Sequence, residues 1–384
     1  MGLTCVILAA GKGTRMNDPD RAKVMFPVGG VPMIDHVVDR ARESGADHVA
    51  VVIGHQRESV RNHLAERYGD FVAFAEQIEQ RGTGHAVMQT IPMLAVRGGE
   101  TLVLSGDVPL LTTRTIAELV AHHRSMNAAA TVLTVDAPDP TGYGRVLRNP
   151  DGSVARIVEH RDATDQERDV REINSGIYVF NTVDLLQALS HLRPDNTQGE
   201  YYLTDVFAWL RSQHRPVFAW RTGDYDEVHG INTREQLAAA DSQWVRTRGM
   251  RISHSCVAVA DLEEAMRKYG ALFGNLHPHR ERVDEQMVDV ASFPVGDAVV
   301  ELTAATDDAS PIAKFLARRG EGVHHIAIEV KDLQSEIDRL KGTGVRLIDE
   351  SPRQGAHDML IAFVHPSSFN GVLVELCQKR SSAA

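Results

Sequence analysis

Hydrophobic and polar positions along the first 240 residues follow two alternating periods. Apolar runs of strand length, such as LTCVILAA and HVAVVIG, flank stretches with helical spacing, such as VPMIDHVVDRARESG. The same order returns further along, where ETLVLSGDVPLL, TRTIAELVAHHRS and AAATVLTVD predict a strand, a helix and a strand. Strands separated by helices of about 10–15 residues are typical of a parallel sheet covered on both faces. The pattern therefore predicts an α/β domain with a mostly parallel sheet.

The last 130 or so residues contain a duplication instead. His254 opens HSCVAVADL and His325 opens HIAIEVKDL 71 residues later, and a stretch with helical spacing follows each. Glu301 in VVELTA corresponds to Glu375 in VLVELC, so the histidine and the glutamate are 47 residues apart in one copy and 50 in the other. An internal repeat of this kind predicts paired structural modules.

The two patterns meet in a segment that lacks either period, AADSQWVRTRGM. A chain of 384 residues exceeds the roughly 250–300 residues over which one core usually grows. We therefore predict one domain over residues 1–240, a linker over 241–250 and a second domain over 251–384, with Met250 marking the join. Trp244 leaves open the alternative that this segment packs on one domain as a closing helix.

Charge and cysteine content exclude several classes of protein. The net charge is −11, and both halves are mildly acidic, which argues against nucleic acid as the main partner. No apolar run approaches the roughly 20 residues of a membrane span. The three cysteines (Cys5, Cys256 and Cys377) are far apart and odd in number, so they predict reduced thiols rather than disulfides. We expect a cytoplasmic protein with no membrane partner.

A candidate phosphate site follows the first strand, in LAAGKGTRM. Gly11 and Gly13 free a turn that can bring backbone N–H groups to an anion. Of the 26 basic residues before position 250, only Lys12 and Lys23 are lysines, and both lie here. Lysine contacts phosphate as a compact point charge, whereas arginine is a planar fork. The spacing matches neither a Walker loop nor the dinucleotide fingerprint, because no Gly-Lys-Ser/Thr and no third glycine follow.

Several further motifs follow this loop in order: QIEQRGTGHA, GDVPLL, GYGRV, IVEHRDAT, EINSGIYVF, NTQGEYYLTD and HGINTREQL. With them, residues 3–240 resemble the nucleotidyltransferases that join a sugar 1-phosphate to a nucleoside triphosphate, and most closely the uridylyltransferase domain that makes UDP-N-acetylglucosamine. The resemblance implies a Rossmann-like nucleotidyltransferase fold, with UTP and N-acetylglucosamine 1-phosphate as substrates and Mg²⁺ as cofactor.

The same resemblance implies roles for individual residues. Arg15 and Lys23 act on the reacting phosphates, and Asp107 and Asn232 hold Mg²⁺. The implied substrate-binding positions are Leu8, Ala9, Gly11, Gly13, Thr14, Gln77, Gln80, Gly82, Thr83, Gly144, Glu159 and Asn174. Gly11 to Arg15 wrap the triphosphate, the two glutamines read the uracil edge with the help of Gly82 and Thr83, and the last three hold the amino sugar. Taken singly, Asp107, Asn174 and Asn232 could each be a turn residue and Glu159 a solvated one.

The chain departs from this family at two points. Ser105 stands where the bacterial family usually has tyrosine, which leaves a transferase for another sugar 1-phosphate as the alternative. The hexapeptide repeats of the family's usual acetyltransferase domain do not appear after residue 240. We therefore expect no acetylation of glucosamine 1-phosphate.

The duplicated half predicts one metal ion bound by both copies. Imidazole and carboxylate together suit Zn²⁺, Co²⁺, Mn²⁺ or Ni²⁺. A histidine would open a strand in each copy, and an ionised glutamate inside an apolar strand needs a partner or a metal. Alternatively, each histidine is structural.

Residues 251–379 resemble the vicinal-oxygen-chelate superfamily, and within it methylmalonyl-CoA epimerase. The segments that carry the resemblance are HSCVAVADLEEA, VDEQMV, SPIAKFLARRGEGVHHIAIEV, GAHDMLIAFVHP and GVLVELCQ. It implies two paired βαβββ modules, the metal ligands His254, Glu301, His325 and Glu375, and methylmalonyl-CoA as substrate. A homodimer through this domain is left open.

The implied reaction moves a proton at C2 between a base on one face and an acid on the other, roles that the family gives to Glu285 and Glu375. Gln286 is a weaker candidate for a supporting donor. We expect His324 to face away from the metal, because successive strand residues alternate. The alternatives to an epimerase are a glyoxalase-like enzyme and a non-catalytic module that binds a metal or a small molecule.

Overall fold

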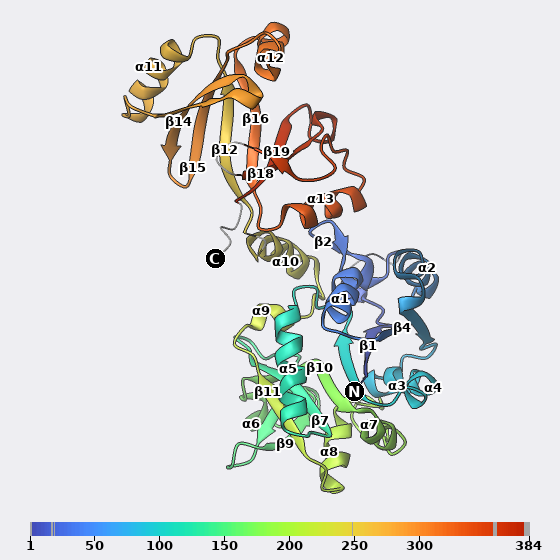
Figure 1. Ribbon diagram of the computed structural model, residues 1–384. Helices are drawn as coiled ribbons and strands as arrows, with labels where there is room; N and C mark the ends of the chain where they lie inside the picture. Colours follow the sequence, from blue (N-terminus) through green and yellow to red (C-terminus); the bar gives the residue numbers. More distant parts are fainter. Residues whose placement is uncertain (1, 17, 19, 248, 356–358, 380–384) are drawn as a thin grey trace. The chain divides into compact units, whose positions relative to one another are not determined.

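The computed structural model describes residues 2–16, 18, 20–247, 249–355 and 359–379 (Figure 1). Contacts divide the chain into two compact units, one ending at Ser242 and the other beginning at Gln243. Among the described residues, no helix combines the length and the apolar character needed to cross a membrane.

A mostly parallel sheet forms the centre of the first unit. Its strands run in the order β11-β7-β10-β6-β1-β4-β5, and β10 is antiparallel to both of its neighbours while the other pairs are parallel. The strands are β1 (Leu3–Ala9), β4 (His48–Ile53), β5 (Val72–Glu76), β6 (Glu100–Ser105), β7 (Ala130–Asp136), β10 (Glu172–Asn181) and β11 (Val217–Arg221). Two further strands, β8 (Arg145–Arg148) and β9 (Val154–Val158), extend from β10, and β2 (Pro27–Val28) pairs with β3 (Val31–Pro32).

Helices pack on both faces of this sheet, as the sequence predicts. The helices are α1 (Met33–Glu43), α2 (Arg57–Tyr68), α3 (Thr83–Met88), α4 (Ile91–Ala95), α5 (Thr113–Ser125), α6 (Asp165–Arg168), α7 (Thr182–Leu189), α8 (Asp205–Ser212) and α9 (Tyr225–Val228). Alternate residues of β1 enter different cores. Cys5 and Ile7 pack with α1, α2 and α5, whereas Val6 packs with α3, α4, α7 and α8. Short 3-10 turns are η1 (Thr14–Met16), η2 (Lys23–Met25) and η3 (Gly69–Phe71). Burial of both faces explains why the parallel strands are almost entirely apolar.

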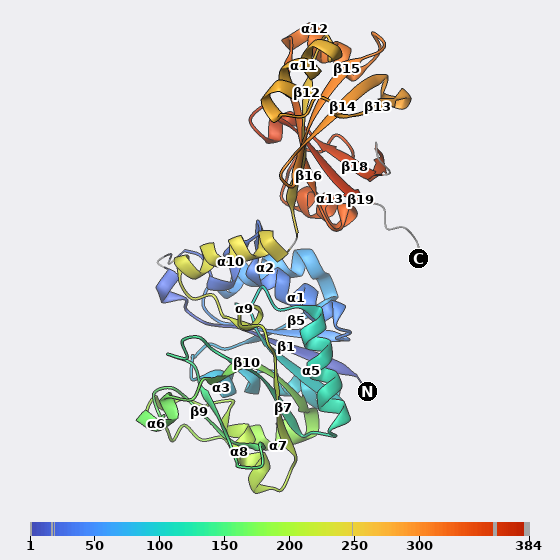
Figure 2. The ribbon, with the colours of Figure 1, turned by 90° about the vertical axis from the view of Figure 1, so that its left-hand side faces the viewer.

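The second unit is a single curled sheet with the strand order β13-β14-β15-β12-β16-β19-β18-β17 (Figure 2). Its strands are β12 (Arg251–Ala258), β13 (His279–Val283), β14 (Val288–Val295), β15 (Ala298–Ala305), β16 (Gly322–Glu329), β17 (Arg353–Gln354), β18 (Met359–Val364) and β19 (Leu373–Lys379). The helices and turns are α11 (Leu262–Phe273), η4 (Asp284–Gln286), α12 (Pro311–Arg319), α13 (Leu333–Gly342) and η5 (Pro366–Ser368).

The duplication is visible in the register of this sheet. The parallel pair β12 and β15 aligns His254 with Val299, and the parallel pair β16 and β19 aligns His325 with Leu373. Each glutamate therefore lies two residues beyond the partner of its histidine, on the same face of the sheet. The aspartate of each repeated segment also has the same role in both copies. Asp261 caps the N-terminus of α11, and Asp332 caps the N-terminus of α13.

Two local expectations were wrong. Helix α10 (Arg234–Thr247) includes residues 241–247, which we expected to lack periodic structure. His254 and His325 each lie fourth in their strands rather than at the start, because pairing between β12 and β16 begins earlier, at Arg251 and Gly322. Residues 356–358, which lie in GAHDMLIAFVHP, and residues 380–384 of the predicted second domain lie outside the described residues. The domain limits at 240 and 251 stay predictions.

Candidate functional site

The first unit brings Lys23, Asp107 and Asn232 to one point beyond the carboxyl ends of β1 and β6. The Nζ of Lys23 forms an ion pair with Asp107 and donates to Oδ1 of Asn232 at 2.7 Å. Arg15 donates to the same Asn232 oxygen at 2.9 Å. Ligands bind at this edge in open α/β sheets. Residues separated by as many as 217 positions thus meet where a phosphate group could be bound.

The glycine loop packs against Lys23. Leu8 and Ala9 end β1, and the loop reaches the turn Thr14–Met16 through Gly13, whose φ is +60°. A Cβ atom at Gly13 would lie 2.6 Å from the Cβ of Lys23, so a side chain there would displace the lysine. At Gly11 a Cβ would meet no atom within 4 Å. The loop therefore requires glycine at 13 for both conformation and space.

The predicted uracil-reading segment is held against this loop and against the segment before α8. Gln80 donates through Nε2 to the backbone oxygen of Ala10 at 2.7 Å. Gln77 is buried and donates to the oxygen of Gly82 at 3.0 Å, which fixes the following turn. The hydroxyl of Thr83 accepts from Leu203 N at 3.1 Å. Hydrogen bonds to backbone oxygens thus position both amide groups.

The three residues predicted to hold the amino sugar lie together. A Cβ at Gly144 would come within 3.3 Å of the Glu159 carboxylate, and the backbone N–H of Asn174 donates to the Gly144 oxygen at 2.9 Å. Burial raises the pKa of Glu159, and the hydroxyl of Thr204 donates to it at 3.2 Å. The sequence analysis did not single out Thr204, although it lies in the NTQGEYYLTD motif. Ser105 ends β6 near Gly176, where a Cβ would lie 3.2 Å from its hydroxyl.

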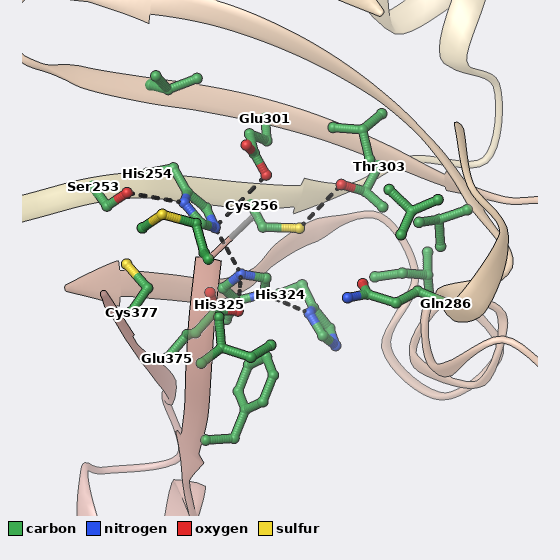
Figure 3. Close-up of a pocket in the computed structure, with 18 of the residues that line it drawn as sticks. Ser253, His254, Cys256, Gln286, Glu301, Thr303, His324, His325, Glu375 and Cys377 are labelled. Carbon is green, nitrogen blue, oxygen red and sulfur yellow. Dashed lines mark hydrogen bonds and ion pairs between the residues drawn. The ribbon is translucent and has the colours of Figure 1, made fainter. Parts of the chain in front are cut away.

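In the second unit, the four predicted metal ligands converge on one cavity (Figure 3). The Nε2 atoms of His254 and His325 are 3.1 Å apart. Glu301 lies 3.6 Å from His254, and Glu375 lies 3.4 Å from His325, in each case from Oε2 to Nε2. The donor atoms of His254, His325 and Glu375 all fall within 4.8 Å of one another.

Burial disfavours the charged forms of three residues in this cluster. It raises the pKa of Glu375 to about 8, with Glu301 adding to the rise, and it raises the pKa of Glu301 to about 7. It lowers the pKa of His325 to about 2, with a further contribution from His254 and His324. Neutral imidazoles facing buried carboxylates form the donor set of a divalent metal site, and a cation would stabilise the ionised carboxylates. The residues present therefore fit a bound metal ion.

The cavity has a volume of about 830 Å³, and Glu285 and Gln286 line it together with the donor cluster. Glu285 lies in η4 and is exposed, whereas Glu375 is only 7% exposed. The two carboxylates thus enter one cavity from different depths, which the sequence alone could not indicate.

His324 contradicts the expectation that it faces away from this site. Its Nδ1 lies 2.9 Å from Nδ1 of His325, and it lines the same cavity. The physical reason is a register shift between β12 and β16: Cys256 pairs with His325 and Val257 pairs with Val323, so His324 is passed over. A β-bulge interrupts the alternation of side chains.

Comparison with known proteins finds a match for each part of the chain. Residues 4–233 match the family model described as Nucleotidyl transferase. The chain belongs to this family. Residues 253–363 match the model described as the Glyoxalase/Bleomycin resistance protein/Dioxygenase superfamily.

The nucleotidyl transferase domain is similar to two curated proteins named Bifunctional protein GlmU. Identity over 236 residues is 45% for the protein of Enterococcus faecalis and 47% for that of Halalkalibacterium halodurans, and each match covers 62% of this chain. The matches cover 50% and 51% of those proteins, so the chain spans about half the length of these relatives.

Two solved structures are also similar to parts of the chain. UDP-glucose pyrophosphorylase complexed with UDP-glucose covers 65% of this chain and matches over its full length with 17% identity and a TM-score of 0.53, which shows a shared fold. Methylmalonyl-CoA epimerase from Mycobacterium tuberculosis is 38% identical, with 34% of this chain and 88% of that chain covered and a TM-score of 0.32.

Proposed function

We propose that the first unit transfers a uridylyl group from UTP to N-acetylglucosamine 1-phosphate, giving UDP-N-acetylglucosamine and pyrophosphate. The observation that carries this proposal is the meeting of Lys23, Asp107 and Asn232 at the carboxyl edge of the sheet. Membership of the nucleotidyl transferase family supports the reaction class, and the ordered motifs support the choice of substrates.

Asp107 and Asn232 are the proposed Mg²⁺ ligands. Their oxygens converge on a cation, the ammonium of Lys23, so the two oxygens can face one ion. When bound, Mg²⁺ would supply charge neutralisation and orientation at the phosphate oxygens. Lys23 and Arg15 then contribute positive charge where negative charge accumulates during transfer.

The reaction needs no nucleophile from the protein. The phosphate oxygen of the sugar phosphate attacks the α-phosphorus of UTP, and the bond to the leaving pyrophosphate breaks, so residues of the site position and neutralise the reactants. Gly144 leaves space beside the Glu159 carboxylate for a sugar hydroxyl or amide. The buried carboxylate is the feature that supports recognition of a polar sugar.

Product analysis tests this proposal. Purified protein with Mg²⁺, UTP and N-acetylglucosamine 1-phosphate should form UDP-N-acetylglucosamine and pyrophosphate. Glucose 1-phosphate and glucosamine 1-phosphate serve as competing acceptors under the same conditions. Faster turnover of either one would replace the proposed acceptor, and no transfer to any of the three would reject the proposal.

We infer that the second unit epimerises methylmalonyl-CoA at C2. The observation that carries this proposal is the presence of two carboxylates, Glu285 and Glu375, in one cavity with the duplicated histidines. Removal of a C2 proton and its return to the other face need two separate groups. The sequence resemblance and the superfamily match support this chemistry, and a glyoxalase-like reaction remains the competing hypothesis.

His254, Glu301, His325 and Glu375 are the residues that would hold a divalent transition metal of the Co²⁺, Zn²⁺, Mn²⁺ or Ni²⁺ kind. When bound, it would supply Lewis-acid stabilisation to the oxygens of the substrate. Glu285 takes the C2 proton, and the electron pair of the broken C–H bond enters the thioester carbonyl system. Glu375 returns a proton to the opposite face.

A basic surface beside the cavity supports a CoA thioester as the substrate. A smaller cavity shares Pro311, His324 and Leu373 with the larger one. Lys314, Arg318 and Arg319 also line this smaller cavity, all from α12. Three cations next to an active-site cavity suit the phosphate groups of CoA.

Isotope exchange tests the second activity. With a divalent metal in heavy water, the protein should exchange the C2 proton of methylmalonyl-CoA and interconvert its epimers. The hemithioacetal of methylglyoxal is the comparison substrate. Faster conversion of that compound would favour a glyoxalase-like enzyme, and metal binding without turnover of either compound would favour a non-catalytic module.

A further inference from the structure

The β-bulge that brings His324 into the cavity also creates a second set of donors. His324 stands beside His325 with Nδ1 atoms 2.9 Å apart, and Cys256 faces His325 directly across the strand pair. The thiol of Cys256 and one ring nitrogen of each histidine fall within 4.8 Å of one another. Among the described residues, this group and the His254, His325 and Glu375 group are the ones with spacing suited to a metal ion.

The two groups share His325 but use different edges of its ring (Figure 3). Its Nε2 lies 3.1 Å from His254 and 3.4 Å from Glu375, whereas its Nδ1 faces His324. A neutral imidazole has one nitrogen that can donate a lone pair, because the other carries the proton. One His325 side chain can therefore serve either group, but not both in its neutral form.

The second group is not a consequence of the duplication. The position equivalent to Cys256 in the other copy is Ala327, and the position equivalent to His324 is Ser253, given the 71-residue offset. Ser253 contacts Nδ1 of His254 at 3.4 Å through its hydroxyl, so the first copy has no matching imidazole there. The sulfur-containing group thus exists on one side of the pseudo-twofold axis and adds donors that the fold does not require.

The donor types of the two groups differ in softness. One offers two imidazoles and a carboxylate, which suit Mn²⁺ or Co²⁺, and the other offers a thiolate and two imidazoles, which suit Zn²⁺ or Cd²⁺. Cys256 is 2% exposed, and its sulfur lies 3.3 Å from the hydroxyl of Thr303, a donor that can support a thiolate. A thiol gives up its proton when it binds such an ion.

We propose that Cys256, His324 and His325 form a second binding site for a thiophilic divalent cation. A cation bound there takes His325 away from His254 and Glu375, so the two sites compete for one residue. The site discriminates between metal ions, because softer cations bind the group that contains the Cys256 thiolate on one edge of the His325 ring. The assignment stands whether or not the proposed epimerase reaction is correct, since it concerns metal binding alone.

Cadmium titration of the metal-free chain, with both units present, tests the site, because a cadmium–thiolate bond adds a charge-transfer band in the ultraviolet. We expect this absorption to saturate at one Cd²⁺ per chain and to disappear in Cys256→Ala. Cys377→Ala is the matched control: Cys377 also lines the cavity but lies outside the group, so its variant should keep the absorption. Absorption that persists in Cys256→Ala, or cadmium binding without thiolate absorption, would overturn the proposal.

Competition for His325 has its own readout. Protein loaded with Mn²⁺ should release it as the thiolate absorption grows, and the paramagnetic signal of free Mn²⁺ reports the release. Retention of Mn²⁺ at saturating Cd²⁺ would overturn the shared role of His325. His324→Gln should weaken Cd²⁺ binding about tenfold or more through loss of an imidazole donor, and unchanged Cd²⁺ affinity would exclude His324. Because no measurement here involves turnover, failure of this site and failure of the epimerase proposal are distinguishable.

Discussion

His254 and His325 approach each other at Nε2, 3.1 Å apart, from the fourth position of two antiparallel strands. Two histidines this close cannot both be protonated without strong repulsion, and burial lowers the pKa of His325 to about 2. Each is also within 3.6 Å of a glutamate from its own copy of the repeat. The histidine pair can therefore donate lone pairs to a cation, and a bound cation would compensate the negative charge of the two ionised glutamates.

The first prediction concerns pH and the metal-free protein. Glu301 and Glu375 have ordinary pKa values near 4.5 when unfolded and about 7 and 8 when folded. The folded state thus keeps protons that the unfolded state releases, so the free energy of unfolding should fall as pH rises towards 8. The opposite effect of His325 is complete above about pH 6.5, its ordinary value. Calorimetric unfolding of the metal-free protein at pH 6.5 and 8 measures this change.

Metal should reverse that loss, because it binds the ionised carboxylates. The rise in melting temperature on adding Mn²⁺ should be larger at pH 8 than at pH 6.5. His254→Ala provides the control and should abolish the metal-dependent rise at both pH values. An equal rise at both values in the unaltered protein would contradict the assignment of the two glutamates as ligands.

The second prediction separates the base from the metal ligands. Glu285→Gln removes a carboxylate and retains its shape, so epimerisation and isotope exchange should fall on the order of 10²-fold or more. Metal content should stay unchanged, because Glu285 lies outside the donor cluster. Asp284→Asn is the matched control, since Asp284 is the preceding acidic residue of η4 and pairs with Arg282 at the surface. Normal exchange by Glu285→Gln would reject the two-carboxylate mechanism.

The third prediction concerns the contact between Gly13 and Lys23. Gly13→Ala should destabilise the first unit by about 1–3 kcal/mol, because a left-handed residue gains a Cβ that collides with the lysine. Uridylyl transfer should fall as well, since Lys23 is displaced. Gly11→Ala tests the opposite case: open space surrounds that position, so unfolding should change by less than about 0.5 kcal/mol. Equal destabilisation by the two variants would contradict the packing argument.

The fourth prediction tests Lys23 directly. Lys23→Ala should lower the rate of uridylyl transfer on the order of 10²-fold or more, through loss of charge at the reacting phosphates. Asp107→Asn should weaken the dependence on Mg²⁺, which a titration of the ion measures. Arg97→Ala is the control, as Arg97 is an exposed cation that precedes β6, at the opposite end of that strand from Asp107. Normal transfer by both Lys23→Ala and Asp107→Asn would reject the site.

The hydrophobic periodicity predicted secondary structure correctly where one pattern of burial holds along the whole element. The strand LTCVILAA and the helix TRTIAELVAHHRS have the predicted character, because β1 is buried on both faces and α5 on one. The convergence of the two histidines and two glutamates could be predicted because the duplication places each His–Glu pair in the same register. The meeting of Lys23 with Asn232, 209 residues later, could be expected only from family resemblance, because topology rather than spacing brings them together.

His324 shows why some side chains of the cavity could not be predicted from the sequence. Strict alternation would turn it away from the cavity, but a one-residue register shift turns it inward. The shift depends on pairing with β12, a strand about 70 residues earlier, and no local feature of HHIAIEV signals it. The proximity of Cys256 to His324 and His325 could not be predicted for the same reason, because these neighbours come from another strand.

The last prediction is that the two units fold independently. Separate cores support it, with α1, α2 and α5 packing on one sheet and α11 and α13 on the other.

The best position for a split is harder to choose, because α10 continues to Thr247 and the units divide after Ser242, within that helix. Thr247 also accepts a hydrogen bond from Lys331 at 3.0 Å, and Met250 packs with α13. A split after Gly249 preserves all of α10 in the first piece and removes the hydrogen bond between Thr247 and Lys331 from the second. Both pieces should be soluble, the first retaining uridylyl transfer and the second retaining metal binding and epimerisation, with melting temperatures close to those of the two transitions of the full chain. An inactive or insoluble piece would mean that the units depend on each other for folding or for a shared site.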